Sequence, residues 1–171
     1  MLLEIIFQDI QIAIVCVFFI AIAWLLAEFK GMKDELKERL GINNDTLKFR
    51  MQAYERLTLL ADRISLKNLV TRTDFTNLNV IDFQLLLLQT IRAEYEHNVS
   101  QQIYVSANMW KAIGDLRDQN IFIINQLAAN LPNHAKAVEL SKQLLEYVAN
   151  PNADLSLIVL DALQFEAKQL F

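Results

Sequence analysis

A long apolar stretch near the N-terminus constrains the fold of this chain more than any other feature. Residues 10–27 (IQIAIVCVFFIAIAWLLA) contain no charged side chain and one polar side chain, Gln11, and the acids Asp9 and Glu28 stand at the two ends. As a helix the stretch is about 27 Å long at about 1.5 Å per residue, close to the roughly 30 Å of a bilayer's hydrocarbon core. Only a helix crosses lipid as a single segment, since it pairs its own backbone groups. We therefore expect residues 1–29 to form a transmembrane anchor, and a buried helix of a soluble protein is the alternative.

The distribution of basic residues predicts how such an anchor is oriented. No Lys or Arg precedes Lys30, whereas Lys33, Lys37 and Arg39 follow closely. Positive charge stays on the cytoplasmic side of a membrane, so the N-terminus is expected outside and the C-terminal domain in the cytoplasm. The lack of basic residues before the apolar stretch also argues against a cleaved signal peptide.

Composition favours an all-α protein and excludes several kinds of chemistry. Three glycines and two prolines are few for a sheet protein with many turns, and three glycines cannot build a glycine-rich phosphate loop. The single cysteine, Cys16, lies in the apolar stretch, so we expect neither a disulfide within the chain nor a cysteine-based metal site. The net charge of −4 gives no general attraction to nucleic acid. Acids and apolar residues interrupt the best basic stripe, which consists of Arg50, Arg56, Arg63, Lys67 and Arg72.

Helical periodicity divides the rest of the chain. Residues 30–49 are expected to form a juxtamembrane helix, ended by Gly41, and a linker. Residues 50–171 are expected to form a cytoplasmic antiparallel bundle of about five helices. These helices are expected to start near residue 45, to run over residues 80–102, 106–129 and 135–149, and to start again after residue 154. Residues 67–79 are expected to form a long connection, with a short turn of helix as an alternative.

Capping residues and apolar stripes mark the ends and the core of these helices. Asn79, Ser106 and Asp154 are good N-caps, and Asp82 three residues after Asn79 completes a capping arrangement. Asn120 lies on the apolar stripe of its helix and needs a hydrogen-bond partner if it is buried. The expected core stripes of the first and last bundle helices are Tyr54, Leu57, Leu60, Ala61 and Ile64, and Leu155, Ile158, Val159, Ala162 and Leu163.

The densest polar cluster is the segment from Arg92 to His97. Glu94 and His97 have the spacing of three residues found in carboxylate-bridged di-metal sites, but such sites need this pair twice. The other histidine, His134, has no glutamate three residues before it. We therefore expect no cofactor and no metal, and an enzyme or metal-binding bundle that uses Glu94 and His97 is the alternative.

Two segments of the chain resemble the signature segments of an uncharacterised bacterial family, a domain of unknown function. They are residues 52–57 (QAYERL) and residues 89–104 (QTIRAEYEHNVSQQIY). The resemblance implies one N-terminal transmembrane helix, a helical cytosolic domain and a place in the bacterial inner membrane, and it implies no activity. It makes the two segments candidates for a shared polar network or docking face, made of Tyr54, Glu55, Arg56, Arg92, Glu94 and His97.

A specific hypothesis about this network follows. We expect Glu55 and Arg56 on one helix to meet Arg92, Glu94 or His97 on the next in a buried network. The substitution Arg92→Ala is then expected to unfold or loosen the bundle.

These observations favour an interaction protein over an enzyme. We expect a non-catalytic, membrane-anchored protein that serves as an accessory subunit of an inner-membrane complex. The expected partners are the lipid bilayer and other membrane proteins but no nucleic acid, and a homo-oligomer is a related alternative.

Overall fold

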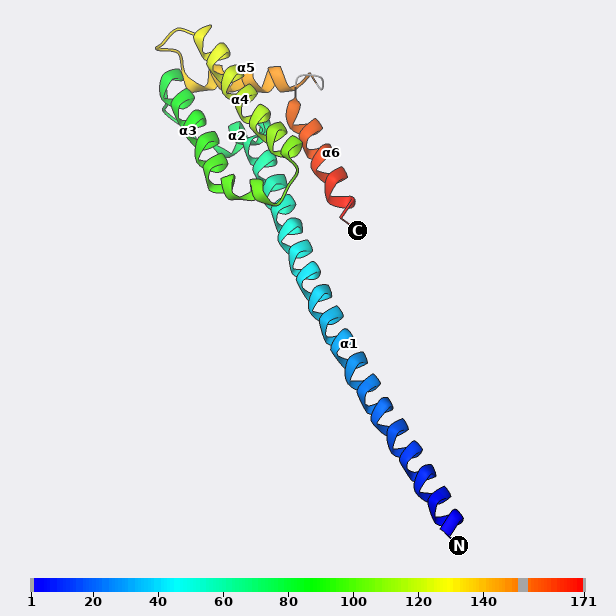
Figure 1. The fold of residues 1–171 in the computed structure, drawn as a ribbon. Coiled ribbons are helices and arrows are strands. Elements are labelled where there is room, and N and C mark those ends of the chain that lie inside the picture. Colours follow the sequence, from blue (N-terminus) through cyan, green and yellow to red (C-terminus); the bar gives the residue numbers. More distant parts are fainter. Residues whose placement is uncertain (1, 151–153, 171) are drawn as a thin grey trace. The chain divides into compact units, whose positions relative to one another are not determined.

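The protein is mostly helical in the part of the chain that this computed structural model describes. The structure describes the backbone of residues 2–150 and 154–170, and the side chains of these residues except 2–17, 19, 23, 42 and 43. Figure 1 shows the helices, and no strand occurs among these residues. The elements are α1 (Leu2–Ile64), α2 (Leu66–Arg72), α3 (Val80–Asn98), the 3₁₀ helix η1 (Val99–Ile103), α4 (Ala107–Ala129), α5 (Ala137–Val148) and α6 (Leu155–Lys168). The predicted all-α class is confirmed.

The chain forms two compact units, residues 1–46 and residues 47–171, and α1 contributes to both. The predicted break at Gly41 is wrong, because α1 is continuous there and no glycine has the positive φ that ends a helix in the left-handed conformation. A glycine inside a helix costs only about 1 kcal/mol, which the surrounding helix-forming residues outweigh.

The segment that was predicted to cross a membrane, residues 10–27, lies within α1. Among the described residues, no helix is both long enough and apolar enough to span a bilayer. The side chains of residues 10–17, 19 and 23 of this segment lie outside the part of the chain that the structure describes. The prediction of one transmembrane helix is therefore wrong, and so is the predicted single-pass placement in a bacterial inner membrane with the N-terminus outside.

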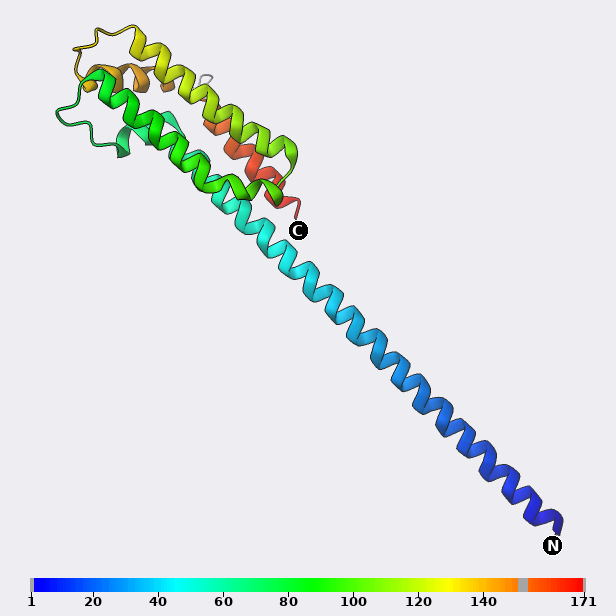
Figure 2. The same ribbon diagram turned by 60° about the vertical axis from the view of Figure 1, so that its left-hand side comes forward.

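In the unit of residues 47–171, the last third of α1 lies among α3, α4 and α6 (Figures 1 and 2). Helices α3 and α4 pack side by side in opposite directions, since the short η1 connects them. Helix α6 packs on α4, while α2 packs on α5, which also contacts α3 and α4. The bundle therefore surrounds the end of α1 with the helices that follow it in sequence.

The core of the bundle agrees with the predicted stripe of its first helix. Leu57, Ala61 and Ile64 are completely buried, and Tyr54 is 3% exposed. The predicted stripe of the last helix is only partly right. Val159 and Leu163 are buried, but Ile158 is 65% exposed, because α6 packs against its neighbours with a narrower face than its apolar sequence suggests.

The predicted helix starts after Asn79, Ser106 and Asp154 are confirmed by hydrogen bonds, whereas the predicted start near residue 45 is wrong because α1 is continuous there. The backbone N–H of Asp82 donates to Asn79 Oδ1 at 2.9 Å, and that of Met109 donates to Ser106 Oγ at 3.0 Å. The N–H of Ser156 likewise donates to the carboxylate of Asp154 at 2.9 Å. These side chains fix the starts of α3, α4 and α6 by satisfying backbone donors that have no partner inside a helix.

Asn120 has the partner that its position requires. It is 4% exposed, and its side-chain Nδ2 donates to the carbonyl oxygen of Ile64 at 2.8 Å. Ile64 is the last residue of α1, where helix carbonyls lack partners within the helix. Asn120 therefore joins the end of α1 to the middle of α4 inside the core.

We expect Asn120→Ala to lower the free energy of unfolding by about 1–3 kcal/mol, because it leaves the buried Ile64 carbonyl without a donor. Denaturant unfolding of the full chain measures this change. The adjacent Gln119 is exposed, so Gln119→Ala serves as the control and should change stability by no more than about 0.5 kcal/mol. Equal effects of the two substitutions would contradict this role of Asn120.

Candidate functional site

Part of the predicted polar network forms a small cluster between α1, α2 and α3. We call it the arginine cluster; it consists of Arg56, Arg63, Arg72, Glu94 and His97. Arg56 donates to His97 Nε2 at 3.2 Å, and the Glu94 carboxylate lies 3.4 Å from Arg63 and 3.8 Å from Arg72. Most of these residues line a hollow of about 120 Å³. Contacts between α1 and α3 thus exist, but on the exposed surface of the bundle.

The other three predicted residues lie elsewhere. Arg92 is exposed, and among the described residues it has no ion pair or side-chain hydrogen bond. Glu55 and Tyr54 line a different concavity, on the α6 side of α1. Successive helix residues point about 100° apart, so Tyr54, Glu55 and Arg56 cannot share one partner.

The arginine cluster is poorly suited to hold a cation. In the part of the chain that the structure describes, no three His, Cys, Asp or Glu side chains gather as metal ligands would. The neighbours of Glu94 are two arginines, whose positive charge repels a metal ion from that carboxylate. The charges around Glu94 therefore do not favour the metal-binding alternative.

We expect Glu94→Gln to lower the free energy of unfolding by about 0.5–1 kcal/mol, because Arg63 and Arg72 then face each other without a counter-charge. Urea titrations at low and at 1 M NaCl measure the loss, which should shrink in high salt. Arg92→Ala is the control and should change stability by less than about 0.5 kcal/mol, contrary to the expectation from sequence. A loss of stability with Arg92→Ala as large as that with Glu94→Gln would contradict this assignment.

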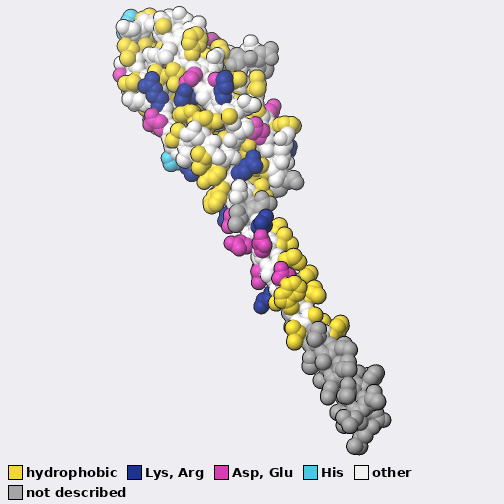
Figure 3. Space-filling model, viewed as in Figure 1, with side chains coloured by type: hydrophobic (Ala, Val, Ile, Leu, Met, Phe, Trp, Pro, Cys, Tyr) yellow, Lys and Arg dark blue, Asp and Glu magenta, His cyan; other side chains and the backbone are white. Residues whose placement is uncertain are grey.

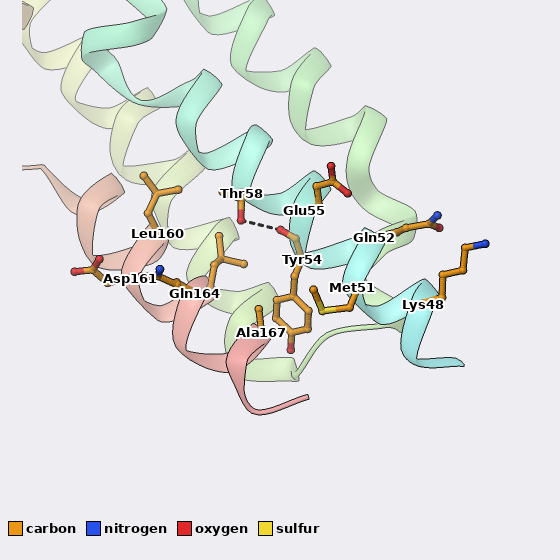
Figure 4. A pocket seen from close by; sticks show the side chains of 11 residues that line it. Lys48, Met51, Gln52, Tyr54, Glu55, Thr58, Leu160, Asp161, Gln164 and Ala167 are labelled. Carbon is orange, nitrogen blue, oxygen red and sulfur yellow. Dashed lines mark hydrogen bonds between the residues drawn. The ribbon is translucent and has the colours of Figure 1, made fainter. Parts of the chain in front are cut away.

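The larger concavity is a groove between α1 and α6, which we call the α1–α6 groove. It measures about 610 Å³ and is open to the outside (Figure 4). Its walls are formed by Lys48, Met51, Gln52, Tyr54, Glu55 and Thr58 of α1 and by Leu160, Asp161, Leu163, Gln164 and Ala167 of α6.

The floor of the groove is apolar and its edges are charged. In Figure 4 the Tyr54 ring and Met51 lie beside Ala167 of α6. The carboxylates of Glu55 and Asp161 stand on opposite sides, and Lys48 lies at one end. This arrangement suits an apolar surface flanked by positive charge.

One residue that sequence analysis did not select holds the groove together. The Glu166 carboxylate of α6 accepts a hydrogen bond from the Tyr54 hydroxyl of α1 and another from the Ser106 hydroxyl at the start of α4, both at 2.8 Å. A signal for Glu166 was present in the sequence. Glu166 lies three residues after Leu163 and seven after Val159, so this acid occupies the next position of the buried stripe of α6.

Burial and the nearby Glu166 carboxylate raise the pKa of Tyr54 above 10.0, the ordinary value of a tyrosine. Burial is the larger cause, since it disfavours the charged phenolate. The phenol therefore keeps its proton, and with it the hydrogen bond to Glu166, at any pH where the unfolded tyrosine is neutral.

We expect this hydrogen bond to add a pH dependence to stability above about pH 10. A raised pKa in the folded state favours folding below the unfolded value, and this stabilisation is lost as the pH rises through the folded pKa. Melting temperatures of the full chain between pH 8 and pH 11 should therefore fall more steeply than those of the Tyr54→Phe variant. Parallel curves for the two proteins would contradict the assignment.

Comparison with known proteins places the chain in a family without an assigned role. The sequence model of the Family of unknown function (DUF7935) matches residues 1–170. No curated protein and no solved structure matches the chain.

Proposed function

The chain belongs to the DUF7935 family, whose function is unknown, and from this premise we propose that it is a non-catalytic interaction protein that binds an amphipathic helix of a partner in its α1–α6 groove. In this role it is an accessory subunit of a protein complex. The single observation that carries the proposal is a groove with an apolar floor between two helices.

The dimensions of the groove support a helical ligand. Its α1 wall extends from Lys48 to Thr58, about 15 Å along the helix, and its α6 wall from Leu160 to Ala167, about 10 Å. A partner helix presents apolar side chains at spacings of three, four and seven residues, which cover a length of about 10–15 Å in two to three turns.

The charges around the groove support a basic partner. Glu55 and Asp161 place negative charge on the two sides, and only Lys48 opposes them among the residues that line the groove. Basic residues beside the apolar stripe of the partner would therefore speed the encounter and fix the orientation.

The polar groups beneath the groove support binding rather than catalysis. The hydroxyls of Tyr54 and Ser106 both donate hydrogen bonds to the Glu166 carboxylate, which links α1, the start of α4 and α6. Their hydrogen bonds already hold the bundle together, so a chemical step that moved their protons would disturb the packing.

We expect the double substitution Glu55→Lys and Asp161→Lys to reduce partner recovery at least tenfold, since it reverses the charge on both sides of the groove. The measurement is affinity capture of the tagged full chain, followed by quantitative mass spectrometry. Both side chains are exposed, so the fold should tolerate the change.

The matched control is Asp115→Lys with Glu146→Lys, which alters the net charge equally at exposed positions outside the groove. A partner that is held by the wild-type and control chains but lost by the groove variant supports the proposal. Equal recovery with all three chains would contradict it, and so would the absence of any protein that the wild-type chain enriches.

A further inference from the structure

An apolar stripe runs along α1 in the unit of residues 1–46. In the part of the chain that the structure describes, nothing covers this stripe, and its side chains are 37–64% exposed. Its members recur at alternating spacings of four and three residues, which is the heptad pattern of a coiled coil. They are Phe18, Ile22, Leu25, Phe29, Met32 and Leu36.

Charged side chains lie off this stripe. Figure 3 shows hydrophobic side chains along one side of this part of α1 and acidic and basic ones along the other. With Ile22, Phe29 and Leu36 at the first heptad position (a), Lys30 and Asp34 fall at outward positions. From Glu28 onward this part of α1 is therefore amphipathic, and its apolar side chains repeat about every 3.5 residues.

We propose that this stripe is the seam of a parallel, two-stranded coiled coil between two copies of this chain. A regular alternation of four and three residues keeps a seam facing a partner helix over its whole length. An isoleucine at position a followed by a leucine at position d, as with Ile22 and Leu25, is the combination that favours two strands.

The charges beside the seam select a second copy in the parallel orientation. Glu28 lies at position g and Lys33 at position e of the next heptad, and these positions face each other across a parallel pair. Two such Glu28–Lys33 contacts form by symmetry. An antiparallel pair would instead bring Glu28 of one copy beside Glu35 of the other, which repel each other.

The size of the stripe is sufficient for a specific contact. Covering six side chains of this kind removes on the order of 600 Å² per chain from water. Two chains then bury about 1,200 Å², the lower end of the range for stable interfaces. The seam ends at Leu36, because the next position is occupied by Arg39, which pairs with Glu35 of its own helix at 2.9 Å.

We expect the full chain to have twice its single-chain mass in sedimentation equilibrium at micromolar concentration. The double substitution Leu25→Lys and Met32→Lys should reduce the mass to that of one chain, because it places four ammonium groups in the seam. The control is Trp24→Lys with Gly31→Lys, one residue earlier in each heptad, which adds the same charge on the outer face and should leave the mass doubled.

These side chains contact little within a single chain, so circular dichroism should show unchanged melting of the bundle in both variants. A wild-type chain with the mass of a single copy would overturn the proposal. The same holds if this single copy binds phosphatidylcholine vesicles, because the stripe would then contact lipid and not a second copy. Doubled mass in the seam variant would overturn it too, since the contact would then lie elsewhere.

A charge test fixes the orientation: Glu28→Lys should weaken the dimer at least threefold, and adding Lys33→Glu should restore it. Failure of the second change to restore it would contradict the parallel arrangement.

Discussion

The carboxylate of Glu166 accepts hydrogen bonds from two helices that lie far from it in sequence. Tyr54 donates from α1 and Ser106 from the first residue before α4, and both bonds measure 2.8 Å. Each bond to a carboxylate is stronger than one between neutral groups. This bridge and the packing of α6 on α4 hold α6 beside α1. The α1–α6 groove exists only when α6 holds this position.

The end of α1 is fixed by a second polar contact inside the core. Asn120 donates to the Ile64 carbonyl, so the middle of α4 holds the point where α1 stops and the chain turns into α2. Together the two contacts attach α1 to α4 and α6 at positions ten residues apart, about 15 Å along the helix. The arginine cluster lies on a different side of the same helix from the groove.

The groove and the apolar stripe are separate surfaces with separate physical origins. The groove forms where two packed helices leave a concavity, so it depends on the tertiary structure of residues 47–171. The stripe lies on one helix in residues 1–46 and needs only the helical period. If the two proposals hold, a pair of copies joined through the stripe would bring two groove-bound partner molecules together, which raises avidity.

The sequence by itself determined the helical class, the starts of α3, α4 and α6, and the buried stripe of Tyr54, Leu57, Ala61 and Ile64. These features depend on residues within a few positions of one another, where the helical period and capping chemistry act. The same reasoning failed at residues 10–27 and at Gly41, because local apolarity and local propensity do not decide what a helix packs against or where it ends.

Only the tertiary structure decided which polar residues act together. It paired Arg56 with His97, left Arg92 without such a partner among the described residues, and joined Glu166 to Tyr54 across 112 positions of sequence. Such contacts depend on the rotation of each helix about its axis and on the packing between helices. A shift of one residue turns a side chain by about 100°, so sequence spacing alone cannot place the two ends of a long-range hydrogen bond.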